Sequence, residues 1–268
     1  MATIARRFIG WNRKVSRWER SLVARVAPGC ARPGPREFQE RVLPSLLAPK
    51  QRVLDVGGGK HPAIPLPVKQ ELGLHVVGLD VSPSELAQAP AGAYDATIVG
   101  DVATVGIPGE YDLVFSRSVM EHVADPGAAL ANLASVLAPG GVMAHVMPCR
   151  NAPFAIINRA LGNRLARRLL FAIAPHKQAN SGFRAYYRDC TPSRMSRLCR
   201  GCGLEVVATL PYYNSGYTAF FAPLYTVELL RQALMATLRL ENHSESFALV
   251  ARAPRAGAAR HTGATPPA

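Results

Sequence analysis

Short apolar runs alternate with longer amphipathic stretches through the middle of this 268-residue chain. The apolar runs predict β-strands at Arg52–Val56, His75–Asp80, Ala96–Gly100, Asp112–Ser116 and Val142–Met147. Helical or loop stretches separate them, and the clearest is a helix predicted over Pro126–Leu137 that stops at Pro139-Gly140-Gly141. This strand–helix alternation predicts a parallel sheet with helices on both faces.

On either side of this region the pattern differs. A basic segment with Trp11 and Trp18 ends in proline and glycine breakers, and a helix is expected to follow it. After Pro148 we expect a basic amphipathic helix and then a loop with several aromatic residues. Alternation then resumes, and a tail rich in Ala, Gly, Arg and Pro is expected to be disordered. The predicted elements outside the middle region are helices at Arg36–Leu47, Phe154–Ile173, Thr191–Cys202 and Pro223–Leu240, a loop at Ser181–Asp189, strands at Leu204–Leu210 and Ser246–Arg252, and the tail from Pro254.

The composition is that of a globular protein, with 49% hydrophobic and 18% charged residues. The five cysteines are an odd number and are scattered, so no disulfide framework is implied and a reducing, cytoplasmic compartment is the simpler expectation. No apolar run approaches the roughly 20 residues that cross a bilayer. The first ten residues run into a basic stretch where an export signal needs an apolar one, so we expect no export signal; an organellar transit peptide remains compatible with the composition.

The net charge of +13 is unevenly distributed. Residues 1–36 hold nine Lys/Arg and one acidic residue, and residues 150–200 hold eleven and one, whereas residues 37–149 hold six basic and twelve acidic residues. The appended segments therefore favour anionic partners such as phosphorylated substrates, anionic lipid surfaces or nucleic acid. Solvated basic faces without a partner are the alternative.

A glycine-rich turn follows the first predicted strand, in Val53-Leu-Asp-Val-Gly-Gly-Gly-Lys60. Glycine brings backbone close to a ligand, and open α/β sheets bind nucleotides at the carboxyl ends of their strands. A dinucleotide-binding Gly-x-Gly-x-x-Gly motif does not fit, because Lys60, His61 and Pro62 follow Gly59. The carboxylate of Asp55 would also repel a pyrophosphate, but it suits a cationic ligand bearing an ammonium and a sulfonium group.

Two further carboxylates follow the next two strands. Asp80 ends the second strand, where it can accept both hydroxyl groups of a ribose, and Asp101 follows the third, where it can accept from an adenine amino group beside the apolar Val102. Each acid alone could be a helix cap. Three acids at three successive strand ends, behind a glycine turn, favour a nucleoside site.

Residues 52–147 resemble a class I S-adenosylmethionine-dependent methyltransferase, of the small-molecule type whose fourth strand leads into Glu121-His-Val-Ala-Asp-Pro126. The resemblance implies a Rossmann-like doubly wound sheet of about seven strands with a helical insertion or lid. It implies S-adenosyl-L-methionine as cofactor, with Asp55, Gly57, Gly58 and Gly59 on the methionine part, Asp80 and Val81 at the ribose, Asp101 and Val102 at the adenine, and Ser116 lining the pocket. The third glycine of the family motif is replaced by His61.

Methyl transfer depends mainly on holding acceptor and sulfonium together, and an oxygen acceptor also benefits from a base. His122, just after the fourth strand, is the first candidate for that base, with a structural histidine as the alternative. His145 alternates within a strand and is expected in the core, while His176, Tyr186 and Tyr187 are candidates for the acceptor side. Cys199 and Cys202 have metal-site spacing but no second pair, so no metal is expected.

The resulting expectation is a basic segment (1–36), a methyltransferase domain (37–253) and a tail (254–268). The domain would contain a cofactor core (51–147) and acceptor or lid insertions (150–190 and 211–243). The acceptor would be a small molecule or a lipid- or glycan-linked one, methylated at oxygen, with peripheral contact to the inner membrane face through the basic segments. A non-catalytic relative that binds the cofactor is the alternative. Nucleic-acid methylation is less favoured, because no Asn/Asp-Pro-Pro-Tyr/Phe motif or RNA-binding module is present.

Overall fold

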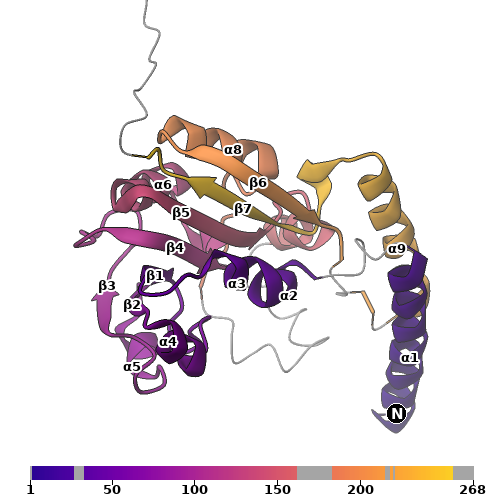
Figure 1. The fold of residues 1–268 in the computed structure, drawn as a ribbon. Coiled ribbons are helices and arrows are strands. Elements are labelled where there is room, and N and C mark those ends of the chain that lie inside the picture. Colours follow the sequence, from indigo (N-terminus) through magenta and orange to yellow (C-terminus); the bar gives the residue numbers. More distant parts are fainter. Residues whose placement is uncertain (1, 27–32, 162–182, 215–217, 220, 256–268) are drawn as a thin grey trace, which may run out of the picture.

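The computed structural model describes residues 2–26, 33–161, 183–214, 218–219 and 221–255. Within them, seven strands form one sheet in the order β3-β2-β1-β4-β5-β7-β6 (Figure 1). The strands are β1 (Arg52–Val56), β2 (His75–Asp80), β3 (Ala96–Val99), β4 (Tyr111–Arg117), β5 (Leu137–Pro148), β6 (Glu205–Tyr212) and β7 (Ser246–Arg252). Strands β1 to β5 are parallel, and β7 lies antiparallel between β5 and β6. The doubly wound sheet predicted from the sequence is confirmed.

Strand β5 begins five residues before its predicted start. Its pairing with β4 shifts between Tyr111, opposite Leu137, and Leu113, opposite Val142. Gly140 has a φ of 78° in the intervening bulge. The prolines and glycines there interrupt the strand register without ending the strand, which is how a β-bulge works.

Helices cover both faces of the sheet. They are α1 (Ala2–Val26), α2 (Gly34–Glu37), π-helical η2 (Phe38–Val42), α3 (Leu43–Leu46), α4 (Leu66–Leu72), α5 (Pro83–Ala87), 3₁₀-helical η3 (Met120–His122), α6 (Pro126–Ser135), α8 (Pro192–Gly201), α9 (Ala222–Thr237) and 3₁₀-helical η5 (Glu241–His243). Asp125 caps α6 by accepting from the Ala128 N–H at 3.0 Å. The helix predicted over Arg36–Leu47 forms as α2, η2 and α3 in succession.

Residues 153–161 are helical, as the start of the helix predicted at Phe154–Ile173. The rest of that prediction lies outside the described residues, and so do His176 and most of the predicted tail. Within the described ranges, every helix is too short or too polar to span a bilayer.

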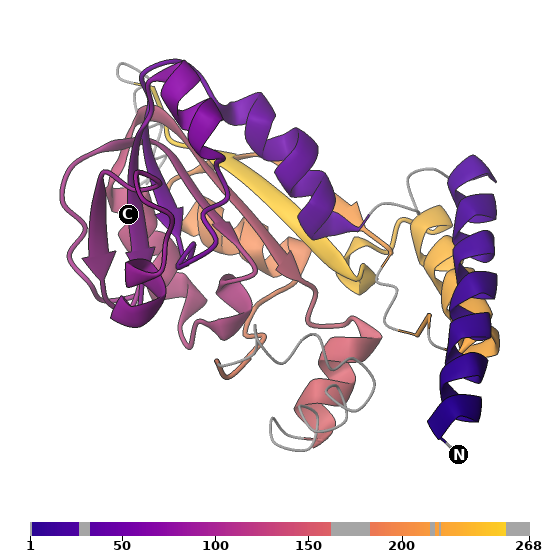
Figure 2. The same ribbon diagram turned by 90° about the horizontal axis from the view of Figure 1, so that it is seen from below.

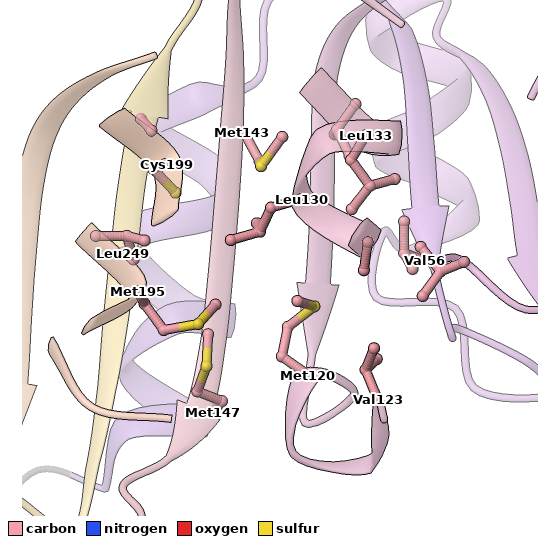
Figure 3. Close-up of a cluster of buried hydrophobic side chains, with 14 of the residues drawn as sticks. Val56, Met120, Val123, Leu130, Leu133, Met143, Met147, Met195, Cys199 and Leu249 are labelled. Atoms are coloured by element: carbon pink, nitrogen blue, oxygen red, sulfur yellow. The ribbon is translucent and has the colours of Figure 1, made fainter. Parts of the chain in front are cut away.

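Two apolar clusters hold the layers together. One joins α6 and α8 to the sheet, where side chains of the two helices point onto β5 and β7 (Figure 3). The other packs Phe38 and Leu43 against strand residues such as Leu113 and Phe115 on the opposite face. Side chains of β1, β2 and β4 belong to both clusters, so these three strands are packed on both faces of the sheet. The residues labelled in Figure 3 are Val56, Met120, Val123, Leu130, Leu133, Met143, Met147, Met195, Cys199 and Leu249.

Helix α1 packs along α9 (Figures 1 and 2). Asn12 accepts a hydrogen bond from the Ala222 N–H at 2.8 Å, and Arg20 donates to the Tyr225 hydroxyl at 3.0 Å. The basic N-terminal segment and the predicted insertion at 211–243 are therefore brought side by side, although about 200 residues separate them.

Candidate functional site

Two adjoining cavities open at the carboxyl ends of β1, β2 and β4. Their volumes are about 390 and 540 Å³, and both are lined by Gly57, Asp80, Ser118 and Phe183. Together they are large enough for a nucleoside with a side chain, because ligand pockets range from about 300 to 1,000 Å³. The predicted site residues Gly57, Gly58, Gly59 and Asp55 line the larger cavity, and Val81, Asp101, Val102 and His122 line the smaller.

The glycine turn leaves no room for a side chain at Gly57 or Gly58. Gly57 has a φ of 70°, and a Cβ there would lie 2.3 Å from Val119. A Cβ on Gly58 would lie 2.3 Å from the hydroxyl oxygen of Tyr94. His61, where the family motif has a third glycine, is not among the positive-φ residues of the described chain, so its backbone suits any residue. The departure from the motif therefore causes no strain.

Asp55 is almost completely buried, at 2% exposure. Its carboxylate accepts from the Ala63 N–H at 3.2 Å and from the Tyr94 hydroxyl at 3.4 Å. Burial raises the pKa of Asp55 to about 6, and these hydrogen bonds and the nearby Arg117 offset only part of that effect. A buried carboxylate whose negative charge is only partly compensated favours a cationic ligand.

Asp80 and Asp101 reach the cavity from neighbouring strand ends. Asp80 accepts from the Ser82 N–H at 2.9 Å, and burial is the main cause of its raised pKa. Asp101 accepts from the Ala103 N–H at 2.9 Å, next to the buried Val102. Val81 is 55% exposed beside them. In each residue one carboxylate oxygen accepts a backbone hydrogen bond of a local turn. Both side chains also line the smaller cavity, where they can accept hydrogen bonds from a ligand.

Ser116 does not line either cavity, so that prediction is wrong. Its side chain is fully buried, and its hydroxyl is 2.7 Å from Nδ1 of His145. His145 lies in the core as expected, and burial lowers its pKa to about 4. Strand β4 ends at Arg117, so Ser118 lies beyond the strand, and its side chain, at a φ of 57°, lines both cavities.

Arg117 is a site residue that the sequence reasoning missed. It donates to Gln39 at 3.0 Å and to the His61 carbonyl at 3.2 Å, and it lines the larger cavity with Asp55. The cavity thus offers a cation beside a carboxylate, which together match an α-amino acid group. The available signal was its place at the end of the fourth strand, directly after the predicted strand Asp112–Ser116.

His122 lies at the wall of the smaller cavity with a defined hydrogen bond. Its Nδ1 is 3.0 Å from the Arg184 carbonyl oxygen, so Nδ1 carries the proton and Nε2 is left as an acceptor. Burial lowers the pKa of His122, the hydrogen bond to Arg184 opposing it, so the ring is neutral near pH 7. The adjacent Glu121 lies 3.9 Å from Nε2, and burial raises its pKa to about 8, so this is a neutral pair.

The loop predicted at Ser181–Asp189, described from Phe183 onward, forms one wall of the smaller cavity. Phe183, Arg184 and Tyr186 line it, and the N–H groups of Tyr186 and Tyr187 donate to the Glu121 carbonyl at 2.8 and 3.0 Å. Tyr187 itself is buried in the core, so of the two tyrosines only Tyr186 faces the site.

Cys199 is also buried in the core. No cluster of three or more potential metal-ligating side chains occurs in the described part of the chain.

The residues present fit S-adenosylmethionine. The glycine turn leaves backbone accessible where a Cβ would collide, the buried Asp55 suits a positive charge, and Arg117 suits a carboxylate. The carboxylates of Asp80 and Asp101 stand beside the apolar Val102, as a ribose and an adenine require.

Comparison with known proteins gives the same family. A family described as "Methyltransferase domain" matches residues 20–209. The chain is 29% identical over 167 residues to a ubiquinone biosynthesis O-methyltransferase of Aromatoleum aromaticum, which covers 60% of this chain and 66% of that protein. The chain thus spans just under two thirds of that relative's length.

Two solved structures share the fold. Phosphoethanolamine N-methyltransferase 2 of Haemonchus contortus, in complex with S-adenosyl-L-methionine, has a TM-score of 0.54 at 16% identity, covering 82% of this chain and 53% of that one. An S-adenosylmethionine-dependent methyltransferase of Mesorhizobium loti has a TM-score of 0.52 at 18% identity, covering 82% and 100%. At these identities the likeness shows the fold alone.

Proposed function

We propose that this chain, which belongs to the S-adenosylmethionine-dependent methyltransferases, transfers a methyl group to an oxygen atom of a small-molecule acceptor, free or linked to a lipid or glycan. The observation that carries this proposal is the set of carboxylates Asp55, Asp80 and Asp101 around a glycine turn at one end of the sheet. Similarity to a protein named as an O-methyltransferase favours oxygen as the acceptor atom.

The proposed cofactor contacts follow the charges in the two cavities. Asp55 and the turn Gly57–Gly59 would hold the ammonium end of the methionine part, and Arg117 its carboxylate. Asp80 would accept from the ribose hydroxyl groups beside Val81, and Asp101 with Val102 would hold the adenine. When bound, the cofactor supplies an electrophilic methyl group on a sulfonium sulfur.

The proposed base is His122. With Nδ1 donating to the Arg184 carbonyl, Nε2 has a free lone pair that can take a proton from an acceptor hydroxyl group. The lowered pKa keeps the ring unprotonated near neutral pH, and base catalysis of this kind contributes about 10²- to 10⁴-fold. Tyr186 and Phe183 would shape the acceptor side of the cavity.

Cofactor binding is tested by calorimetry with S-adenosylmethionine and S-adenosylhomocysteine. Asp80→Ala should weaken both ligands by about 10- to 100-fold, since hydrogen bonds to a charged group contribute about 1.5–3 kcal/mol. Glu205→Ala, at an exposed carboxylate on the far edge strand, is the matched control. An Asp80→Ala protein that binds as tightly as the wild type would remove the ribose assignment.

Transfer is tested with radiolabelled methyl donor on aqueous and lipid fractions of a cell extract. His122→Gln should lower kcat by about 10²- to 10⁴-fold without changing cofactor affinity. His75→Gln, at the opposite end of β2, should change neither. If His122→Gln turned over like the wild type, His122 would not be the base. If the wild-type protein bound the cofactor but methylated no fraction, the alternative of a non-catalytic relative would be favoured.

A further inference from the structure

Polar side chains of α1 are buried where this helix meets α9. Asn12 and Ser16 of α1 are each only 1% exposed. Asn12 accepts from the Ala222 N–H at the start of α9, and the Thr226 hydroxyl donates to Glu19 at 2.6 Å. A helix of a water-soluble protein normally buries its apolar side chains, but among the described side chains of α1 the buried ones are polar.

Large apolar side chains of the pair are instead turned to the outside. On α1, Trp11 and Trp18 are 62% and 67% exposed, and Leu22 is exposed as well. On α9, Leu230 is 67% exposed, and the side chains three and four positions from it are exposed too. The exposed apolar residues of α9 and its C-cap are Leu224, Val227, Leu230, Leu234 and Leu238.

The two sets lie on the same flank of the pair. Two neighbouring contacts join the helices, one between Arg20 and the buried Tyr225 and one between Glu19 and Thr226. At 3.6 residues per turn, Trp11, Trp18 and Leu22 point about 160–180° away from Arg20 around α1. Val227, Leu230 and Leu234 likewise point about 140–180° away from Tyr225 around α9. All six side chains lie on the side of the Glu19–Thr226 contact, within about 100° of Glu19 on α1 and of Thr226 on α9. They form one continuous surface, the outer face, made of Trp11, Trp18, Leu22, Val227, Leu230 and Leu234.

Positive charge borders the outer face. Helix α1 has seven basic residues and one acidic residue, Glu19, which is bonded to Thr226. Arg7, Lys14 and Arg25 lie three or four positions from a residue of the outer face, and so flank it on the helix surface. A second copy of this chain would bring the same positive charges against these, whereas an anionic surface would complement them.

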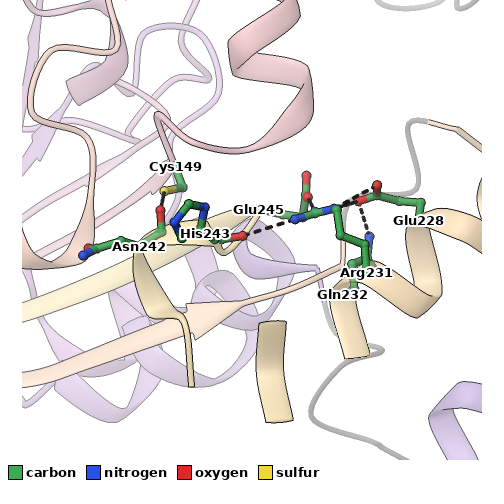
Figure 4. Close-up of polar contacts among 7 residues, drawn as sticks. All are labelled: Cys149, Glu228, Arg231, Gln232, Asn242, His243 and Glu245. Atoms are coloured by element: carbon green, nitrogen blue, oxygen red, sulfur yellow. Dashed lines mark hydrogen bonds and ion pairs between the residues drawn. The ribbon is translucent and has the colours of Figure 1, made fainter. Parts of the chain in front are cut away.

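The helix pair is fixed at the end of the sheet where the cavities open. Cys149, directly after β5, donates to the Asn242 carbonyl at 3.1 Å (Figure 4). Ser246 of β7 pairs with Pro148 at the end of β5. Arg231 of α9 binds Glu228 and the buried Glu245 (Figure 4). Any surface that the outer face binds is thus held near the carboxyl ends of the strands.

We propose that the outer face binds an anionic lipid bilayer, with α1 and α9 lying in the interface. Tryptophan rings favour the interfacial region, leucine and valine side chains bury among acyl chains, and arginine and lysine pair with anionic headgroups. Exposed apolar surface beside basic residues is what such binding requires. The proposal does not depend on which acceptor the protein methylates.

The test uses the full chain and vesicles of phosphatidylcholine with or without phosphatidylglycerol. The chain has two tryptophans, Trp11 and Trp18, and both belong to the outer face, so tryptophan fluorescence reports on it directly. Anionic vesicles should sediment the protein and shift its emission to the blue, and high salt should weaken the binding. Trp18→Ser with Leu230→Ser should weaken binding by about tenfold or more.

The matched control is Val99→Ser with Val207→Ser, which removes two side chains of similar exposure from β3 and β6. It should bind vesicles like the wild type, and both double variants should keep the wild-type affinity for S-adenosylhomocysteine. Equal binding to neutral vesicles, or an unshifted emission, would overturn the proposal. So would a lipid-free dimer that the Trp18→Ser, Leu230→Ser variant dissociates, since the occupant would then be a second copy.

Discussion

Acidification should weaken cofactor binding through a single buried carboxyl group, that of Asp55. Burial raises its pKa from 3.8 to about 6, and only the ionised form can attract a cationic cofactor. A bound cation stabilises the ionised form, so the pKa of Asp55 is lower in the complex than in the free protein. Affinity is therefore lost as the pH falls through the pKa of the free protein.

The size of the effect follows from that pKa. With a value of about 6, roughly 97% of the Asp55 carboxyl is ionised at pH 7.5 and roughly 9% at pH 5, so the apparent Kd should rise about tenfold between them. Asp55→Asn should bind about tenfold or more weakly at pH 7.5 and lose most of this pH dependence.

The assay is calorimetric titration with S-adenosylhomocysteine, which carries the ammonium group and cannot transfer a methyl group. Glu205→Gln is the control and should keep the wild-type profile, because its carboxylate is exposed on the edge strand β6. A wild-type Kd that stays constant from about pH 5 to 8 would refute the reasoning. If Asp55→Asn kept the wild-type pH dependence, another acidic residue would be responsible for it. Asp80→Asn would then test whether that residue is Asp80.

Two further changes test the packing around the site. Gly58→Ala would place a Cβ 2.3 Å from the Tyr94 hydroxyl oxygen, so cofactor affinity should fall and the free energy of unfolding should drop by about 1–3 kcal/mol. The control is Gly106→Ala, whose Cβ would have nothing within 4 Å, and it should change neither quantity. Calorimetry measures the affinity and urea unfolding measures the stability. Equal behaviour of the two variants would mean that the turn is not tightly packed. Burial raises the pKa of Glu121 from 4.5 to about 8, so the folded protein retains a proton in that range, and wild-type stability should fall as the pH rises from about 5 to 8. Glu121→Gln should remove this decline, which amounts to a few kcal/mol at most. If the free energies of unfolding of wild type and variant changed in parallel with pH, the prediction would be wrong.

The meeting of the three carboxylates at one edge of the sheet was predictable, because it depends on local patterns. Each of Asp55, Asp80 and Asp101 ends or follows an apolar run, and parallel strands bring their carboxyl ends to the same edge of a sheet. The pattern thus gave both the residues and their neighbourhood.

The side chains at the end of β4 were harder to predict, because the last residue of the strand decides which side chains lie beyond the sheet. Ser116 was expected in the pocket but lies in the core with His145, and Ser118 faces the cavities in its place. The strand boundary decides this, and apolar patterning gives boundaries only within a few residues. Arg117 was missed for a related reason, since its partners Gln39 and His61 come from distant parts of the chain.

The sequence by itself determined the order of strands and helices, the glycine turn, the acidic strand ends and a basic, tryptophan-containing amphipathic segment. Each of these depends on the periodicity of neighbouring residues. Only the tertiary structure decided which flank of that segment is covered, because α9 supplies its partner from 200 residues away and buries Asn12 and Ser16 in place of the tryptophans. Local periodicity shows that a helix has two faces, but which of them meets solvent depends on what packs against it.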